Sequence, residues 1–361
     1  MTAFGSPSSL TIKTNESPME HDIFLKACRR EPTPYTPIWI MRQAGRYMTE
    51  YREIRQSTPF LTLCKTPELA AEVTLQPLER FDLDAAIIFA DILLPLEPMG
   101  ADLEFTAGEG PVIHNPVRTA ADVDRLRLVE PEADLPFVLE AIGLVRAELD
   151  GKAPLIGFAG APFTLASYLI EGGASRHYLE TKRFMYGAPE AWDALMGKFA
   201  AVVSAYLNAQ ISAGVDAVQL FDSWVGCLSP SDYARYVLPH SKAVIAGLTP
   251  GVPVIHFGTG TATLLELMRE AGGDVIGLDW RVSLGETWER LGPAEVAVQG
   301  NLDPVALHAP TSALRGQVEA ILKAAAGRPG HIFNLGHGVL PTTPVESVAA
   351  LVDMVHELSQ R

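Results

Sequence analysis

Eight short runs rich in valine, isoleucine, leucine and phenylalanine recur along this 361-residue chain, and helical patterns lie between them. Runs of this length and composition are typical of parallel strands that are buried on both faces. Eight strand-then-helix units without a clear linker predict a single-domain (β/α)8 barrel, and a doubly wound parallel sheet is the alternative. The expected strands are Pro37–Met41, Ala85–Ala90, Pro154–Ala159, Ala217–Asp222, Val252–Phe257, Val275–Asp279, Val296–Gly300 and His331–Leu335.

Amphipathic stretches predict the helices, and several of them begin with Pro, Ser or Thr, as helix N-termini do. The segment Leu103–Val117 contains Gly108, Gly110 and Pro111 and predicts a β-hairpin inserted after the second strand. Residues 1–20 are expected to be a disordered lead-in without a signal peptide, and residues 21–361 are expected to form the barrel domain. The expected helices are His21–Arg30, Pro67–Glu79, Glu190–Ala213, Ser231–Leu248, Thr261–Ala271, Pro304–Ala326 and Pro344–Leu358.

A barrel places its functional groups just past the carboxyl-terminal ends of its strands, on one rim. Polar groups follow every expected strand of this chain. They are Arg42 and Arg46, Asp91, Thr164 and Tyr168, Asp222 and Ser223, His256, Asp279 and Arg281, Asn301 and Asp303, and His337.

The segment Arg42-Gln43-Ala44-Gly45-Arg46 predicts an anion site directly after the first strand. A guanidinium offers a planar fork of donors to carboxylate or phosphate oxygens, and Gly45 allows the backbone to approach a ligand closely. The formal net charge of the chain is -15, so such a cluster must reverse the potential locally. For Arg52 and Arg55, which follow nearby, ordinary Glu/Arg pairing on a helix is an equally good interpretation.

Asp91 ends a run that should be buried, and a buried carboxylate needs a partner or a function. It could cap a helix or pair with an arginine; alternatively it could accept ligand N–H groups or stabilise a developing cation. Ser223 is interpreted as a hydrogen-bonding residue, because its surroundings do not form a Gly-x-Ser-x-Gly elbow. His337 lies between two glycines and favours ligand contact, whereas His256 and Tyr168 could equally be packing residues.

The sequence contains no dinucleotide fingerprint, Walker loop or His-Glu-x-x-His motif, and Gly258-Thr259-Gly260 is best explained as a turn. The three widely separated cysteines predict neither a zinc site nor a disulfide framework. An acidic pI of about 5.0 argues against nucleic-acid binding, and no apolar run has the length of a membrane span. A cytoplasmic protein is expected.

Together these motifs resemble the uroporphyrinogen decarboxylase family from about Phe24 onward, and the string from Met41 to Tyr47 is highly specific for it. The other matching segments are Ile87–Leu93, Gly160–Leu165, Leu220–Trp224 and Asn334–Leu340.

The resemblance implies a barrel, usually a homodimer, that removes CO2 from the four acetate side chains of uroporphyrinogen III without metal or organic cofactor. It implies that Arg42 and Arg46, with the Gln43–Gly45 backbone (Gln43, Ala44, Gly45), hold substrate carboxylates, and that Asp91 accepts the pyrrole N–H groups. Tyr168, Ser223 and His337 would contact the rest of the substrate, and the proton donor stays open between Arg42, a water held by Arg42 and a substrate carboxylic acid. Zinc-dependent methyl transfer and a porphyrinogen carrier are the alternative functions.

Overall fold

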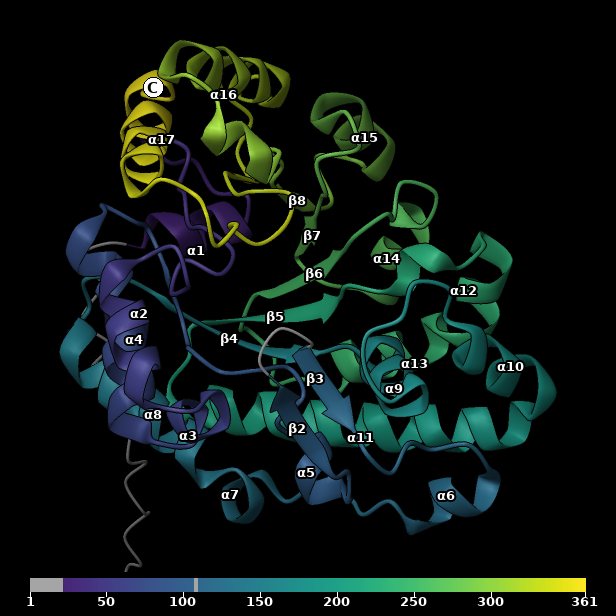
Figure 1. Cartoon of the computed structure of the whole chain (residues 1–361). Coiled ribbons are helices and arrows are strands. Elements are labelled where there is room, and N and C mark those ends of the chain that lie inside the picture. The colour runs from purple at the N-terminus through teal and green to yellow at the C-terminus, as the bar shows by residue number, and fades with distance from the viewer. Residues whose placement is uncertain (1–21, 107–109) are drawn as a thin grey trace, which may run out of the picture.

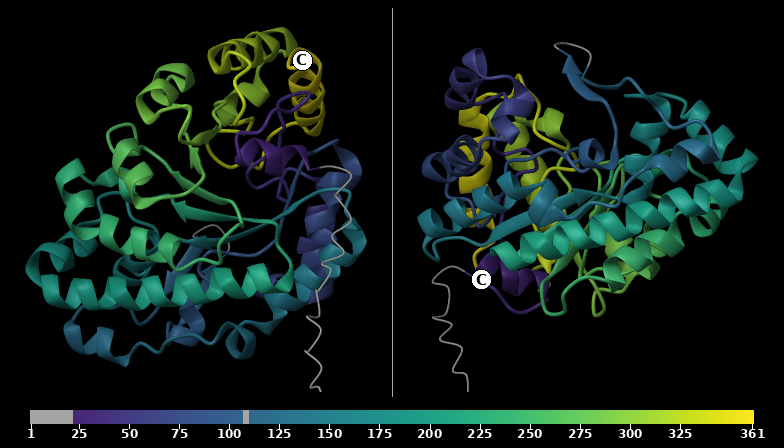
Figure 2. Two further views of the ribbon diagram at one scale, coloured as in Figure 1. Left: turned by 180° about the vertical axis from the view of Figure 1, so that it is seen from behind. Right: turned by 90° about the horizontal axis from the view of Figure 1, so that it is seen from below.

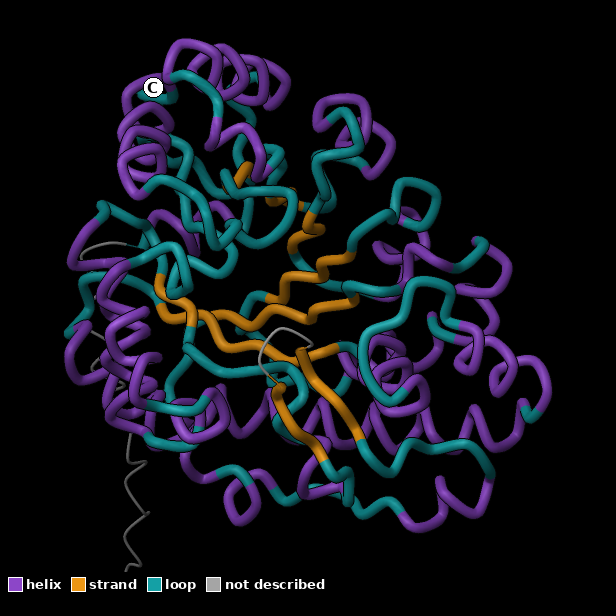
Figure 3. The backbone as a smooth tube through the Cα atoms, viewed as in Figure 1, coloured by secondary structure: helices purple, strands orange, loops and turns teal. Residues whose placement is uncertain are grey.

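A computed structural model describes residues 22–106 and 110–361, and its centre is a parallel sheet of seven strands. Figure 3 shows these strands curled around a common axis, with helices on the outside. The α/β barrel predicted from the strand pattern is therefore confirmed. In spatial order the strands are β1 (Ala86–Ile87), β4 (Leu155–Gly160), β5 (Ala217–Asp222), β6 (Val254–Gly258), β7 (Val275–Gly277), β8 (Ala297–Gln299) and β9 (His331–Ile332).

The expected first strand, Pro37–Met41, forms only one bridge, yet it lies between β9 and β1. On one side Ile38 bridges Phe333 in parallel, and the Phe333 N–H donates to the Pro37 carbonyl at 2.8 Å. On the other side the Asp84 N–H donates to the Ile38 carbonyl at 2.9 Å. A regular ladder does not form because Pro37 has no N–H and because the Ile38 N–H binds the Asp84 carboxylate at 2.7 Å. The segment thus takes the eighth strand position.

Contacts between residues 34–41 and residues 333–361 continue this closure, and we call them the seam. The Thr36 N–H donates to Ser359 Oγ at 2.8 Å, and the Arg361 N–H donates to the Pro34 carbonyl at 2.9 Å. The His356 ring lies 2.9 Å from the Asp84 carboxylate, so the last helix is tied to the start of the barrel.

Helices pack around the sheet because each exposes a polar face and buries an apolar one. Figures 1 and 2 show the longest, α11, running along one side of the barrel. The surrounding helices are α4 (Pro67–Arg80), α8 (Pro136–Leu149), α11 (Pro189–Ala213), α12 (Pro230–Tyr236), α13 (Leu238–Ala246), α14 (Leu265–Ala271), α15 (Leu284–Leu291), α16 (Thr311–Ala325) and α17 (Val345–Leu358).

Two expected helices are each divided in the structure, and a proline lies at both breaks. The stretch Ser231–Leu248 forms α12 and α13, with Pro239 in the first turn of α13. The stretch Pro304–Ala326 forms the 3-10 helix η2 (Pro304–His308) and α16, which begins directly after Pro310. Proline lacks the N–H that a continuous helix needs, so it is accepted at a helix start but interrupts a longer one.

Shorter elements decorate the barrel. They are α1 (Ile23–Cys28), α2 (Thr49–Ser57), α3 (Phe60–Cys64), α5 (Leu96–Met99), α6 (Ala120–Arg125), α7 (Pro131–Asp134), α9 (Pro162–Glu171), α10 (Leu179–Gly187) and the 3-10 helix η1 (Val225–Cys227). Within the described residues, no helix combines the length and apolar character needed to cross a membrane.

The predicted hairpin is present after β1. Strands β2 (Leu103–Thr106) and β3 (Gly110–Ile113) pair antiparallel, and the Ile113 N–H donates to the Gly172 carbonyl at 2.9 Å. This contact joins the hairpin to the loop between α9 and α10. Gly108, His21 and the expected lead-in of residues 1–20 lie outside the described residues.

A row of polar side chains crosses the interior of the barrel. Trp39 Nε1 donates to Gln299 Oε1 at 2.8 Å, and Gln299 Nε2 donates to Gln219 Oε1 at 3.0 Å. All three residues are buried. Buried polar groups are stable only when they are hydrogen-bonded, so this row fixes the irregular 37–41 segment against β5 and β8.

Candidate active site

Arg42 begins the turn that follows the 37–41 segment, and its backbone adopts an unusual left-handed conformation with φ of 64°. The neighbouring residues hold this conformation in place. The Met41 N–H donates to Asn334 Oδ1 at 2.9 Å, and the Val339 N–H donates to the Met41 carbonyl at 2.9 Å. Left-handed backbone at a non-glycine residue costs free energy, and such strain concentrates at functional sites.

The side chain of Arg42 lies across Gly338. A Cβ atom on residue 338 would lie 2.5 Å from Arg42 Cδ, closer than real Cβ contacts allow. Within the described residues Arg42 and Arg46 are exposed and form no ion pair, so their guanidinium donors are available at the mouth of the barrel. Because residue 338 is a glycine, the loop after β9 can pack closely against the side chain of Arg42.

Gln43 supports the turn between the two arginines. Its buried side chain accepts from the Ile40 N–H at 3.0 Å and donates to the Ala85 carbonyl at 3.1 Å. Its own N–H donates to the Ile40 carbonyl. Ala44 and Gly45 remain partly exposed between the arginines.

Asp91 follows β1, beside the 37–41 segment, and is partly buried. Its Oδ1 accepts from the Leu93 N–H at 2.8 Å, and no arginine or lysine of the described chain forms an ion pair with it. Burial raises the pKa of Asp91, and the Leu93 hydrogen bond and the charge of Arg42 offset this only in part. Asp91 does not cap a helix, because its carboxylate closes a local turn with Leu93, whereas α5 begins at Leu96 with Pro95 as its N-cap residue.

Tyr168 on α9 stacks on Trp224, with ring centroids 3.7 Å apart and an interplanar angle of 29°. Tyr178 meets the same indole edge-on at 5.2 Å. Burial raises the pKa of Tyr168, the charge of Asp91 adds to this effect, and the charge of Arg42 opposes it. The phenol is therefore neutral and close to both groups. Sequence reasoning assigned no role to Trp224, although its position directly after Ser223 was the available signal.

Ser223 follows β5 and is partly exposed at the rim. Its carbonyl accepts from Thr259 Oγ1 at 2.5 Å. The preceding residue, Asp222, is buried and accepts from Thr164 Oγ1 at 3.1 Å, while Thr164 Oγ1 accepts from the Trp224 N–H at 3.3 Å. These bonds fix the backbone that presents Ser223 and Trp224.

His337 follows β9 and is partly buried, 6.3 Å from the ring of Trp280. Burial lowers the pKa of His337, and the charges of Arg42 and Arg281 lower it further. His256 behaves differently: it is fully buried between the sheet and α14, with Nδ1 3.3 Å from the Met268 carbonyl and Nε2 3.9 Å from Asp222 Oδ2, so it is not exposed at the rim.

Several other polar groups at the rim have internal partners. The Gly260 N–H donates to Asp279 Oδ2 at 2.5 Å, which agrees with the interpretation of Gly258-Thr259-Gly260 as a turn rather than a phosphate loop. Asp303 caps η2 by accepting from the Val305 N–H at 2.9 Å. Arg52 donates to Thr49 and Arg55 to the Thr58 carbonyl, so neither forms the expected pair with a glutamate of its own helix.

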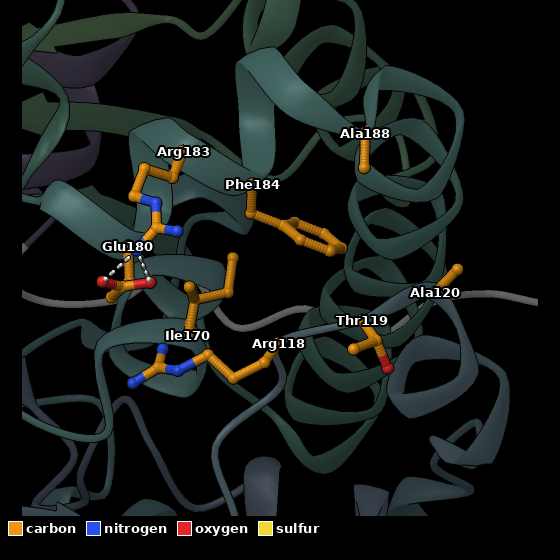
Figure 4. A pocket seen from close by; sticks show the side chains of 8 residues that line it. All are labelled: Arg118, Thr119, Ala120, Ile170, Glu180, Arg183, Phe184 and Ala188. Atoms are coloured by element: carbon orange, nitrogen blue, oxygen red, sulfur yellow. Dashed lines mark hydrogen bonds and ion pairs between the residues drawn. The ribbon is translucent and has the colours of Figure 1, made fainter.

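A separate pocket of about 240 Å³ opens away from this cluster. Figure 4 shows Arg183 beside Glu180, at 3.1 Å, and Phe184 in the pocket wall. None of the predicted site residues lines this pocket. Its lining residues are Arg118, Thr119, Ala120, Ile170, Glu180, Arg183, Phe184 and Ala188.

The curled parallel sheet and its rim of polar residues place this chain among the α/β-barrel enzymes. Comparison with solved structures agrees on the fold. A methyltransferase from Methanosarcina mazei matches 94% of this chain and 99% of its own, with a TM-score of 0.75 at 22% identity. A B12-independent methionine synthase from Shewanella matches 91% of this chain and 98% of its own, with a TM-score of 0.55 at 12% identity.

Sequence comparison identifies the family. The family model for uroporphyrinogen decarboxylase (URO-D) matches residues 19–358. Uroporphyrinogen decarboxylases from Carboxydothermus hydrogenoformans and Sorangium cellulosum are 63% and 61% identical, each over 94% of this chain and 97% of the relative. The chain belongs to the uroporphyrinogen decarboxylase family.

Proposed function

We propose that this chain converts uroporphyrinogen III into coproporphyrinogen III in haem biosynthesis, removing CO2 from each of the four acetate side chains without metal or organic cofactor. Membership of the family over nearly the full length supports the reaction. The observation that carries the mechanism is the partly buried carboxylate of Asp91 after β1, whose pKa is raised by burial and which the charge of Arg42 stabilises without an ion pair.

The chemistry of the reaction explains why both charges are useful. Loss of CO2 from an acetate arm leaves an electron pair behind, and a pyrrole ring accepts this pair once a ring carbon has been protonated. The protonated ring carries positive charge. A fixed carboxylate in a site of low dielectric stabilises that charge more strongly than water does, so Asp91 is the proposed transition-state residue.

The remaining groups bind the substrate in this proposal. Arg42 and Arg46 hold carboxylates, and the exposed backbone at Ala44 and Gly45 lies between them, supported by Gln43. Asp91 accepts the pyrrole N–H groups before it stabilises the cation.

Tyr168, Ser223 and His337 contact the rest of the macrocycle from the β4, β5 and β9 sides of the mouth. Neutral donors suit these positions, because burial keeps the Tyr168 phenol protonated and disfavours the charged form of His337.

The same proposal includes one catalytic domain over residues 21–361, a homodimer and a cytoplasmic location, as the family resemblance implies. Light scattering during gel filtration measures the dimer directly. A mass of one chain at micromolar concentration would contradict it.

The test of the mechanism is anaerobic turnover of uroporphyrinogen III by the wild type and by Asp91→Asn, each with and without a chelator. Removing one preorganised electrostatic group typically costs about 10²–10³ in rate, so we expect a loss of this size in kcat. Because the pKa of Asp91 is raised, wild-type kcat/KM should fall on the acid side at a pH above the ordinary value of 3.8. Asp91→Asn should lack this acid limb.

Asp82→Asn is the matched control, since Asp82 is largely exposed at 90% and lies before β1 rather than after it. Its activity should equal that of the wild type. If the wild type binds the substrate but releases no CO2, the carrier function replaces the enzymatic one. If chelator abolishes turnover, the account without metal is wrong and the zinc-dependent alternative returns.

A further inference from the structure

We propose that Arg281 is a further substrate-binding residue, which holds a carboxylate of the macrocycle on the side of the mouth formed by β7. The inference rests on the proposed function, because it requires a substrate with carboxylates around its whole edge. It adds a third arginine to Arg42 and Arg46, and this third arginine lies outside the matching family segments.

Arg281 lies at the same end of the barrel as the candidate active site. It follows β7 by four residues and belongs to the same rim as Asp91 and His337. In the order of the barrel, β8 and β9 separate β7 from the 37–41 segment. Arg281 therefore follows a different strand position of the rim from Arg42 and Arg46.

The guanidinium of Arg281 is fixed before any ligand binds. It lies 3.8 Å over the ring of Trp280, and its Nη1 donates to Asp279 Oδ2 at 2.7 Å. The side chain is nevertheless 51% exposed, whereas Asp279 is 2% exposed. Within the described residues only Nη1 of the guanidinium forms a hydrogen bond, so the other donors of the fork have no protein partner there.

The loop that carries Arg281 is itself rigidly held. Asn301 Nδ2 donates to the carbonyls of Asp279 and Val282, at 2.9 and 2.8 Å. A Cβ on Gly336 would lie 2.2 Å from the Trp280 nitrogen, so the β9 loop packs directly on this loop. A cation held in this way loses little conformational entropy on binding.

Arg281 is also electrostatically connected to the candidate site. Its charge and that of Arg42 both act on His337, in addition to burial, to lower the pKa of that ring. The Trp280 ring, which Arg281 covers, meets His337 edge-on at 6.3 Å. The charges of both arginines therefore act at His337, and the Gly338 backbone hydrogen bond and the charge of Asp279 oppose them only in part. An anionic ligand that reaches His337 comes within range of both charges.

A purely internal role for Arg281 would be to neutralise Asp279. This carboxylate already accepts two backbone N–H bonds, from Gly260 at 2.5 Å and from Arg281 at 2.9 Å. The Asp279 carboxylate therefore has hydrogen-bond donors besides the exposed guanidinium of Arg281. Both backbone bonds can still form when only the Arg281 side chain is substituted.

The experiment compares Arg281→Gln with Arg290→Gln. Arg290 on α15 is 49% exposed and bonds to Glu266 at 2.7 Å, so it matches Arg281 in exposure and pairing but lies on an outer helix. A charge-assisted hydrogen bond that is lost should raise KM for uroporphyrinogen III about tenfold or more. We expect kcat to change less than about threefold and Arg290→Gln to keep the wild-type KM.

Two further measurements make the result decisive. Arg281→Lys keeps the charge without the planar fork, so its KM should lie between those of the wild type and Arg281→Gln. Added salt should raise KM less in Arg281→Gln than in the wild type, because one attractive charge is missing.

An unchanged KM in folded Arg281→Gln, or equal changes in Arg281→Gln and Arg290→Gln, would overturn the proposal. If Arg281→Gln does not fold, an unchanged KM in Arg281→Lys would overturn it as well. Wild-type turnover tests the proposed function separately, since a wild type without activity would refute that function whatever the variants do.

Discussion

Gly336 and Gly338 differ in what a methyl group would meet, although only one residue separates them. At residue 338 the nearest atoms belong to the flexible side chain of Arg42, the closest at 2.5 Å. At residue 336 the nearest atom is the backbone nitrogen of Trp280, at 2.2 Å. A side chain can move aside, but two packed backbones cannot do so cheaply.

We therefore predict different outcomes for two alanine variants. Gly338→Ala should displace Arg42 and raise KM about tenfold, while the free energy of unfolding changes by less than about 1 kcal/mol. Gly336→Ala should lower that free energy by about 2 kcal/mol or more, because it forces two loops apart. Urea denaturation and steady-state kinetics on both proteins check the prediction. Equal loss of stability in the two variants would contradict it.

Some of the candidate site residues could be predicted from the sequence. Arg42, Asp91 and His337 could be singled out because charged or polar residues that follow apolar runs are unusual and mark a rim. The burial of His256 could not be predicted, since a strand end gives no indication of which way the ring faces. The roles of Gln43 and Thr164 also depend on partners that are distant in the chain, such as Ala85 and Asp222.

At the scale of elements, α17 is held to the barrel by a titratable contact. Burial by itself would lower the pKa of His356, but the hydrogen bond to Asp84 and the charges of Asp84 and Asp82 outweigh it, so the pKa is raised above 6.5. Tyr35 completes the contact: its hydroxyl donates to Asp84 at 3.0 Å, and its ring lies 4.5 Å from His356.

This contact should make stability depend on pH in a predictable direction. The pKa of His356 is higher in the folded state than in the unfolded state. The contribution of His356 to the free energy of unfolding is therefore fully present below the unfolded-state pKa of 6.5, and it is lost as pH rises through the folded-state pKa. We expect the destabilisation caused by His356→Gln to be largest near about pH 6 and to shrink toward about pH 9. Urea unfolding of both proteins across this range measures the difference. A difference that stays constant with pH would exclude the effect.

Helix and strand positions followed from periodicity, but their ends and interruptions did not. Pro239 and Pro310 divide two expected helices, and both prolines are visible in the sequence. A proline that begins a new helix and a proline that kinks a continuous helix have similar neighbouring residues in the sequence. Whether the helix is divided there therefore depends on how each segment packs.

On the scale of the whole molecule, the barrel is closed by side-chain hydrogen bonds as well as by the few backbone bonds of the 37–41 segment. Asn334 Oδ1 accepts the N–H groups of Met41 and Leu335, at 2.9 and 2.7 Å, and the residue is fully buried. Seven of the eight expected strands are present in the sheet, and Pro37–Met41 takes the eighth position without forming a regular strand. The sequence could not show that Pro37–Met41 lacks a regular ladder, because the substituting bonds come from Asp84 and Asn334.

Asn334→Ala should therefore destabilise the protein and weaken the site together. It leaves two buried N–H groups without their acceptor, at about 1–3 kcal/mol each. We expect a lower free energy of unfolding and, because the turn at Arg42 loosens, a higher KM. The control is Asn208→Ala, since Asn208 bonds at the exposed end of α11 to Gly247 and Thr249. A variant of Asn334 with unchanged stability would show that the closure does not depend on this side chain.

The seam also determines when, during synthesis of the chain, the barrel can close. Residues 34–41 are translated long before their partners at residues 333–361, so the two edges of the sheet cannot meet until the later segment has been made. Until then Ile38 and Phe333 lack each other, and the nascent chain exposes an open parallel sheet of the kind that aggregates most readily. The turn that carries Arg42 takes its final form only once Asn334 and Val339 are available to bind Met41, and a chaperone that covers the 37–41 segment during translation would protect the fold and the future binding site at once.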